Sequence, residues 1–376
     1  MDNYIYVGNY CLSENFQTAG GKRILNQISY LKEKANVFVI SFSPSKSNLS
    51  FHKNFKIDND RGFGFFIQLF IYWVEIGYII LKRKNSKAKN VLFLQSTVII
   101  PTVIPLFFAK IVGYKVVFDI VEDVSLEEDV SKKKRLTLWM NTFFMHHLDS
   151  YCNGVIVISE NLFKKFEIYK LPITKLYNSV EERAVKIKLE DNPKKFNFFY
   201  SGTFAEKDGV LDLINAFNLV SAKHKNIKLT LVGKGKGNYF EHCLIAINNS
   251  PLITYLGYVS EEKMFDEMIN SQALCVTRSN SEYANNGFPF KLAEYMSFGI
   301  PTIATAVSDI PQLLTDNDTI YLAKPGNSNS IADKMMLILE NYTMALEVGK
   351  RGQSYCENNF SIPTIGENLF NFLKTI

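Results

Sequence analysis

Residues 273–305 read ALCVTRSNSEYANNGFPFKLAEYMSFGIPTIAT, and this stretch decides the fold. Apolar runs at residues 273–277 and 302–304 predict two short strands, and the apolar spacing near residues 290–298 predicts a helix between them. Strands joined through a helix form a βαβ unit, and successive units build a parallel sheet. The stretch therefore predicts an α/β protein, whose ligands bind where strands end and helices begin.

The same alternation continues outward along the chain. In the first half, helical patterns near residues 22–33, 63–82, 103–112, 132–148 and 160–167 separate strand-like runs at 4–7, 37–42, 91–95, 115–120 and 154–159. In the second half, helical patterns near 209–222, 261–270, 290–298, 327–341, 343–356 and 363–375 separate runs at 196–200, 228–232, 253–256, 273–277, 302–304 and 319–322. We therefore expect two doubly wound parallel-sheet domains, divided within the charged stretch 181–195.

Composition excludes several classes of protein. Of the 376 residues, 47% are hydrophobic and 21% charged, which is typical of a globular chain. The five cysteines form no C-x-x-C pair, so a zinc ribbon or redox dithiol is not expected and a reducing compartment fits. The five histidines lack metal-ligand spacing, so we expect no metal and no bound cofactor. The N-terminus shows no signal-peptide pattern.

Charge is unevenly divided between the two halves. The net charge is +5, but residues 1–180 hold 23 Lys/Arg against 15 Asp/Glu, whereas residues 181–376 hold 19 against 22. A basic half beside a mildly acidic half indicates an anionic partner on one side. No basic run interleaved with aromatic residues and no nucleic-acid-binding module is recognisable, so nucleic acid is not expected.

Residues 63–81 (FGFFIQLFIYWVEIGYIIL) could form a helix that is buried in the protein, lies at a membrane surface or spans a bilayer. The segment is long enough to span a bilayer. Gln68 and Glu75 would lie in hydrocarbon, and the segment stands between strand-like runs, so we favour a buried or interfacial helix over a spanning one. The basic residues 82–84 that follow predict contact with an anionic membrane surface.

The turn at residues 286–291 resembles an anion site. Gly287 lets the backbone approach a ligand, and Pro289 suits the first position of the helix. Lys291 in the first turn opposes the helix dipole unless an anion binds there, and Glu294 shares its face. The carboxylate of Glu294 suits hydroxyl donors such as a ribose diol. The alternative is a solvated Lys–Glu pair on an ordinary helix, and these residues alone leave both open.

Two other turns give weaker signals. Residues 200–213 place Gly202 at a strand end and Lys207 before Asp208, a natural N-cap. We favour Lys207 as an ordinary surface lysine over an anion contact. The glycines at 233, 235 and 237 match only part of a dinucleotide fingerprint.

Taken in order, these motifs resemble the GT-B glycosyltransferases, specifically glycosyltransferase family 4. The resemblance rests on Gly202…Asp208-Gly209, Leu231-Val232-Gly233, Leu256-Gly257-Tyr258-Val259, and Gly287-Phe288-Pro289…Glu294…Gly299-Ile300-Pro301. Looser matches in the first half are Gly20-Gly21, residues 117–123 (VFDIVED), residues 155–159 and residues 177–180.

The resemblance implies an architecture and a reaction. It implies a Rossmann-like acceptor-binding domain at residues 1–185, a nucleotide-sugar-binding domain at 186–360, and a C-terminal helix at 361–376 that packs back on the first domain. The two domains would face a cleft, and the family is retaining and metal-independent. The chain departs from the pattern at Asn286, where the family has a glutamate that Glu282 could replace, and at Thr203 and Asp208, where it has Arg and Lys.

Residue by residue, the resemblance gives three sets. The catalytic set is Asn286, Lys291 and Glu294, of which Glu294 binds the donor ribose. The donor-binding set is Gly202, Thr203, Lys207, Tyr258, Val259, Glu282, Gly287, Phe288 and Pro289, with Lys207 and Lys291 as substitutes for the missing cations. The acceptor-side set is Gly20, Gly21, Asp119 and Glu122. For Asp119 and Glu122, helix-capping or solvated side chains are the favoured alternative.

We therefore expect a hexosyl-type glycosyltransferase that uses a UDP- or GDP-sugar as a substrate. The expected acceptor is a saccharide, in particular a polyprenyl-linked intermediate of a bacterial surface polysaccharide such as O-antigen or capsule. The expected location is the cytoplasm, at the inner face of the membrane. The alternatives are a catalytically weak GT-B subunit that binds a partner transferase, and a GT-B UDP-sugar epimerase.

Overall fold

The computed structural model describes residues 1–13, 16–17, 19–42, 49–55, 63–95, 100–123, 132–181 and 193–376. The chain divides into two compact units, residues 1–179 with 362–376 and residues 180–361. The expected division at residues 185/186 lies outside the described residues, and the structure places the later division at residues 361/362. A parallel bridge between Val180 and Ser361 brings the two chain passages between units side by side.

The first unit contains a seven-stranded parallel sheet in the order β5-β4-β1-β6-β7-β8-β9. Its inner strands are largely apolar, as expected for a parallel sheet covered on both faces, whereas the edge strand β5 is polar. They span β1 Asp2–Gly8, β4 Ala35–Ser41, β5 His52–Asn54, β6 Asn90–Gln95, β7 Lys115–Ile120, β8 Gly154–Val157 and β9 Ile173–Lys175. A small antiparallel pair joins β2 Leu12–Ser13 to β3 Phe16–Gln17.

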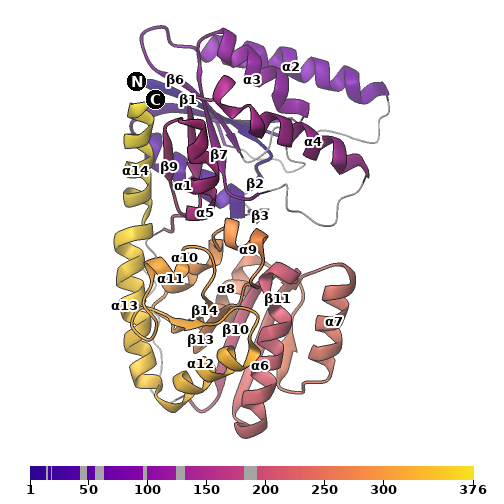
Figure 1. Cartoon of the computed structure of the whole chain (residues 1–376), viewed down its shortest axis with the longest axis vertical. Helices are drawn as coiled ribbons and strands as arrows, with labels where there is room; N and C mark the ends of the chain where they lie inside the picture. Colours follow the sequence, from indigo (N-terminus) through magenta and orange to yellow (C-terminus); the bar gives the residue numbers. More distant parts are fainter. Residues whose placement is uncertain are drawn as a thin grey trace. The chain divides into compact units, whose positions relative to one another are not determined.

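Helices cover both faces of this first sheet (Figure 1). On one face lie α1 Ala19–Leu31 and α14 Ile362–Thr375, whose apolar side chains share a core with the strands. A Cβ on Gly154 would come within 2.8 Å of Ile376 and 2.9 Å of Phe372, so the glycine makes room for the end of the chain. The other helices are α2 Phe63–Arg83, α3 Ile100–Ile111, α4 Lys132–His146 and α5 Glu160–Phe166.

Helix α2 is the crossover between β5 and β6, as its position in the sequence predicts. By length and composition, Gly64–Arg83 could cross a membrane, yet the helix is fixed to the unit at several points. Trp73 Nε1 donates to Pro101 O at 3.2 Å, the Tyr114 hydroxyl donates to Ile80 O at 2.9 Å, and Glu75 pairs with Lys53 of β5 at 2.6 Å. Only 17% of its most apolar window is buried, so α2 lies on the unit with one apolar face outward.

The second unit contains a six-stranded parallel sheet in the order β12-β11-β10-β13-β14-β15. The strands are β10 Phe196–Thr203, β11 Ile227–Lys234, β12 Ile253–Tyr255, β13 Ala273–Val276, β14 Thr302–Thr305 and β15 Tyr321–Ala323. The main core joins one face of this sheet to α6 Val210–Lys223, α7 Gly237–Asn248 and α12 Ser328–Glu340. The remaining helices are α8 Glu261–Ile269, α9 Glu282–Asn286, α10 Phe290–Met296, α11 Ile310–Leu313 and α13 Tyr342–Phe360.

The expected α/β class with two parallel sheets is confirmed, and several local expectations are corrected. The glycine run at residues 233–237 opens α7, which the sequence pattern does not reveal. Gly233 has φ +137°, and a Cβ there would come within 1.7 Å of Gly202 O. This glycine therefore allows β11 to lie beside β10. It serves strand pairing, and its role does not depend on a dinucleotide.

Candidate donor site

The ends of β10 and β13 bring the expected donor residues to one edge of the second sheet. After β10 the chain forms a short 3-10 turn, Glu206–Asp208, and after β13 it enters the loop that leads to α9. Ser279 N donates to Lys207 O at 3.0 Å, and Thr277 Oγ1 approaches Asp208 O at 3.4 Å. These bonds hold the two loops together, so residues 69 positions apart lie at one site.

Asp208 is not the N-cap of α6, contrary to the expectation. The cap is Gly209, which has φ +62°, and a Cβ there would come within 1.8 Å of Thr277 O. Only glycine fits such a left-handed conformation against a backbone carbonyl. The side chain of Asp208 instead accepts a short hydrogen bond from Thr203 Oγ1.

The ammonium of Lys291 occupies the space left by the missing side chain of Gly202. A Cβ on Gly202 would lie 1.9 Å from Lys291 Nζ. The same nitrogen lies 4.9 Å from the centre of the Tyr200 ring, within the range of a cation–π contact. The lysine therefore lies against β10, with its ammonium beside the Tyr200 ring and in the space next to Gly202.

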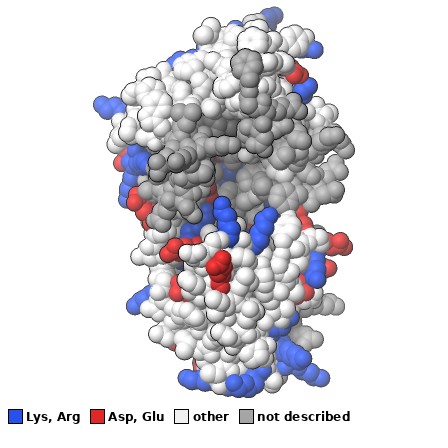
Figure 2. Space-filling view, turned by 90° about the vertical axis from the view of Figure 1, so that its right-hand side faces the viewer, with Lys and Arg blue, Asp and Glu red and all other residues white. Residues whose placement is uncertain are grey.

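Lys291 and four neighbouring charged side chains form a cluster. Burial lowers the pKa of Lys291 to about 8, and the cations Arg278 and Lys207 act in the same direction, while Asp208 and Glu294 oppose them. Three cations against two carboxylates leave the cluster with a net positive charge. Figure 2 shows basic and acidic side chains close together at this end of the second unit, above a largely uncharged surface. A desolvated cluster with surplus positive charge is suited to an anionic ligand.

Helix α10 carries Lys291 and Glu294 and is fixed firmly to the sheet. The buried hydroxyl of Tyr295 accepts from Ser201 N at 2.9 Å, and Cys356 Sγ of α13 donates to Ala293 O at 3.2 Å. Pro289 precedes α10 as its N-cap and is not its first residue, because its ψ of 117° is extended. Glu294 is partly buried one turn after Lys291, as the spacing predicts.

The residues before α10 are mostly buried. Asn286 ends α9 and is 6% exposed, whereas Glu282 at the start of the same helix is exposed. Phe288 is buried against Phe360 with ring centres 6.1 Å apart. A Cβ on Gly287 would come within 3.5 Å of both terminal nitrogens of Arg278, so this glycine leaves room beside the guanidinium.

Two aromatic side chains stand beside lysines near the ends of the strands. Tyr258, 59% exposed, follows β12, and its ring centre lies 4.9 Å from Nζ of Lys234 at the end of β11. Lys207 Nζ lies 4.4 Å from the centre of the Tyr283 ring. Val259 is partly buried next to Tyr258. Tyr258 therefore presents an open aromatic surface of the kind on which a base stacks.

Arg278 is a further member of this site, and no sequence motif predicted it. Arg278 directly follows the strand and Thr277, yet it is only 8% exposed. Its position was the available signal, because an arginine at the carboxyl end of a buried parallel strand points toward the ligand edge of the sheet. Its closeness to Lys291 and Gly287 becomes visible only in the folded unit.

The acceptor-side residues belong to the first unit and have a different character. Gly20 and Gly21 lie in the first turn of α1, where a Cβ on Gly20 would come within 2.9 Å of Gln95 Nε2. Glu122 is partly buried after β7. Asp119, at the end of β7, is 1% exposed and is paired within a buried hydrogen-bond network.

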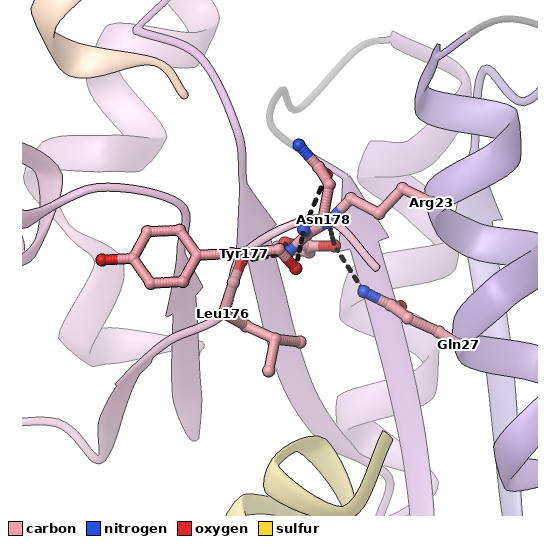
Figure 3. A network of polar contacts seen from close by, with 6 residues as sticks. Arg23, Gln27, Leu176, Tyr177 and Asn178 are labelled. Carbon is pink, nitrogen blue, oxygen red and sulfur yellow. Dashed lines mark hydrogen bonds and ion pairs between the residues drawn. The ribbon is translucent and has the colours of Figure 1, made fainter. Parts of the chain in front are cut away.

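This network centres on Arg23 (Figure 3). Arg23 makes a bidentate pair with Asp119, with both N···O distances 2.9 Å, and also donates to Asn178 Oδ1 and to two backbone carbonyls. Gln27 donates to Asp119 at 3.3 Å. The favoured alternative, in which Asp119 is solvated or caps a helix, is wrong. Asp119 is half of a buried ion pair that ties β7 to α1 and to residues 176–178.

Among the residues that the structure describes, no group of three His, Cys, Asp or Glu side chains could hold a metal ion. The five cysteines are all buried free thiols, and burial raises the pKa of Cys152 to about 12.

Known glycosyltransferases resemble part of this chain in sequence. Residues 181–355 match the family model of the glycosyl transferases group 1. The capsular polysaccharide biosynthesis glycosyltransferase CapM of Staphylococcus aureus is 24% identical over 200 residues, which are 53% of this chain and 50% of that protein. The chain spans about half the length of the curated relatives it matches.

Solved structures extend the likeness to the whole chain. HepE of Anabaena, solved with UDP and glucose, superposes with a TM-score of 0.72 over 99% of both chains at 14% identity. A sucrose-phosphate synthase from Thermosynechococcus elongatus gives a TM-score of 0.75 over 100% of this chain and 99% of that one, at 13% identity. The class expected from the sequence is confirmed: the chain has the GT-B fold of glycosyltransferases. Its second unit matches the glycosyl transferases group 1 model over residues 181–355.

Proposed function

We propose that the chain transfers a hexose from a UDP- or GDP-sugar to a saccharide acceptor. The observation that carries this proposal is the position of Lys291. Its ammonium lies in the space beside Gly202, and the charged side chains around it have a net positive charge. A nucleoside diphosphate is the anionic ligand that a GT-B donor site binds. The family match of the second unit and the UDP present in the HepE structure support the same ligand.

In the proposed reaction the bond between the anomeric carbon and the diphosphate oxygen breaks, and its electron pair stays on that oxygen. Lys291 and Arg278 stabilise the negative charge that develops there, which is the principal catalytic contribution of such a site. The acceptor hydroxyl forms the new bond to the anomeric carbon and releases its proton to the leaving phosphate. We propose retention of configuration and independence from metal, as the resemblance to family 4 implies.

Glu294 and Tyr258 are proposed to hold the nucleoside. The carboxylate of Glu294 accepts hydrogen bonds from the ribose hydroxyls, and the exposed ring of Tyr258 lies against the base. Asn286 and Glu282 contact the sugar, as the family pattern implies for this turn.

The proposed acceptor is a lipid-linked saccharide of a bacterial surface polysaccharide, at the inner face of the cytoplasmic membrane. CapM is a glycosyltransferase of capsular polysaccharide biosynthesis, which supports this acceptor class. A membrane location is supported by an apolar surface of the first unit formed by α2, α3 and α4, which lie side by side (Figure 1). Its exposed side chains include Phe66, Phe70, Val74, Tyr78, Ile111 and Trp139.

This apolar surface, called the α2–α4 face below, is proposed to rest on the membrane without crossing it. A spanning α2 would lose the Glu75–Lys53 pair and its bonds to Pro101 and Tyr114. Trp139, 67% exposed, gives a direct test, because the only other tryptophan is Trp73. Adding anionic vesicles should shift tryptophan emission to shorter wavelength in the natural protein and not in Trp139→Phe. An unchanged spectrum of the natural protein would contradict docking by this face.

A screen of nucleotide-sugars tests the enzymatic proposal. Thermal shift with UDP-, GDP- and ADP-sugars should identify the donor, and turnover should release free nucleotide in the presence of acceptor. A subunit that only binds a partner would release none. An epimerase would convert the donor sugar without any acceptor.

A further inference from the structure

The first unit carries a pocket outside the region expected to bind substrates. It has a volume of about 640 Å³ and lies where the start of β4 and β5 meet the last turns of α2. Its lining includes Asn3, Phe38, Lys53, Tyr78, Lys82 and Arg83. Lys53, Lys82 and Arg83 against Glu75 leave the pocket with a positive charge.

Two of these cations have no carboxylate partner among the described residues. Lys53 pairs with Glu75 at 2.6 Å, but Lys82 and Arg83 form no such pair within that part of the chain. The guanidinium carbon of Arg83 lies 3.6 Å from the centre of the Phe38 ring, so the fork is stacked and its orientation is fixed. Burial lowers the pKa of Arg83, which shows that this cation is partly withdrawn from water. A stacked, unpaired guanidinium suits a phosphate, which it binds with two parallel hydrogen bonds.

The pocket borders the α2–α4 face. Tyr78 and Lys82 are one helical turn apart, and both line the pocket. Tyr78 also belongs to the exposed apolar row of Phe66, Phe70 and Val74, which repeats every four residues along α2. With that row resting on acyl chains, the pocket stands beside it at the level where headgroups lie.

We propose that this pocket binds the phosphate headgroup of an anionic lipid, with Arg83 and Lys82 holding the phosphate. The inference rests on the proposed membrane location and adds a specific lipid contact to it. The apolar row supplies burial, and the pocket fixes which edge of α2 meets the headgroups. The first unit would thereby dock in one orientation, which general attraction between a basic surface and anionic lipid does not provide.

Co-sedimentation with vesicles tests this proposal. Vesicles of equal parts phosphatidylcholine and phosphatidylglycerol should bind the natural chain, and those of phosphatidylcholine alone should bind it weakly. Arg83→Lys keeps the charge but removes the stacked fork, so the pocket predicts roughly fivefold weaker binding, the scale of one lost hydrogen bond. Lys82→Gln/Arg83→Gln should weaken binding further. The matched control is Lys32→Gln/Lys164→Gln, which removes two exposed charges, one after α1 and one on α5, and should bind nearly as the natural chain does.

The outcomes separate the pocket from membrane docking in general. Equal binding by Arg83→Lys and the natural chain, or equal losses in the two double variants, would overturn the pocket and leave docking of the α2–α4 face intact. Absence of binding to any vesicle would overturn both. Saturation of the pocket by inorganic phosphate, with no preference for vesicles, would identify free phosphate as the ligand and overturn the lipid. Unchanged thermal midpoints of the variants confirm that they fold.

Discussion

Two charged clusters stand at the carboxyl ends of parallel strands, one in each unit, and they differ in how completely their charges are satisfied. In the first unit, Arg23 and Asp119 neutralise each other and their hydrogen bonds close on protein groups. In the second, Lys291 is desolvated beside Gly202 and its surroundings hold surplus positive charge. A charge pair whose hydrogen bonds are made within the protein stabilises a fold, whereas surplus positive charge is available to an anionic ligand. The comparison separates a structural site from a candidate donor site, both at the carboxyl ends of parallel strands.

The largest expected effect concerns the buried pair of Arg23 and Asp119. Asp119→Ala leaves Arg23 buried without its carboxylate, so the free energy of unfolding of the first unit should fall by about 3–5 kcal/mol. Both tryptophans lie in that unit, so tryptophan fluorescence during denaturation reports on it. The double variant Arg23→Met/Asp119→Leu removes both charges and should cost much less. If Asp119→Ala unfolds no more easily than the double variant, the network is not structural.

Lys291→Met should have opposite effects on binding and stability. Loss of the ammonium should weaken nucleotide binding by about 1.5–3 kcal/mol, the scale of charged hydrogen bonds. The second unit should become more stable by about 1–2 kcal/mol, because a desolvated cation with a lowered pKa disfavours the folded state. Calorimetry measures the first effect, and hydrogen exchange of β10 and α10 measures the second. Weaker binding together with lower stability would place Lys291 in the structural class of Arg23.

Glu294→Gln should weaken nucleotide binding by roughly 1.5–3 kcal/mol, since the amide is a poorer acceptor for the ribose diol. Folding should be almost unchanged, because Glu294 is only partly buried. The matched control is Glu340→Gln, an exposed carboxylate at the end of α12. Calorimetry with the same nucleotide checks both variants, and an affinity equal to that of the natural chain would remove Glu294 from the site.

The pH dependence sharpens the comparison further. The pKa of Lys291 is lowered from 10.5 to about 8, so nucleotide affinity should fall as pH rises through about 8 and the ammonium loses its proton. The unfolded chain binds more protons than the folded one between these values, so this lysine's penalty on stability is relieved as pH rises from about 8 to 10.5. Calorimetric titrations across this range, repeated on Lys291→Met, measure the difference. A pH profile shared by both proteins would assign the titration to another group.

The smallest expected effect is that of a chelator. The described residues offer no cluster of metal ligands, and the proposed charge stabilisation is carried by Lys291 and Arg278. Sugar transfer should therefore proceed at the same rate with and without a chelator. A strict requirement for Mg²⁺ or Mn²⁺ would contradict the proposed mechanism.

The sequence by itself determined the architecture and most of the candidate site. Its alternating strand and helix periods predict two parallel sheets, because apolar periodicity depends on local geometry. The motif at residues 286–301 marks the donor turn for the same reason, since Gly287, Pro289 and Gly299 act through local backbone conformation. The helical spacing of Lys291 and Glu294 also follows from the chain alone.

Only the tertiary structure decided which charges are paired. Asp119 and Arg23 are 96 positions apart, and their pairing depends on β7 lying beside the helix that follows β1. The closeness of Arg278 to Lys291 and the stacking of Arg83 on Phe38 likewise arise from packing between distant segments. Burial and pairing are properties of three-dimensional neighbours. The sequence therefore shows which residues can carry charge chemistry, and the fold decides which of them remain open to a ligand.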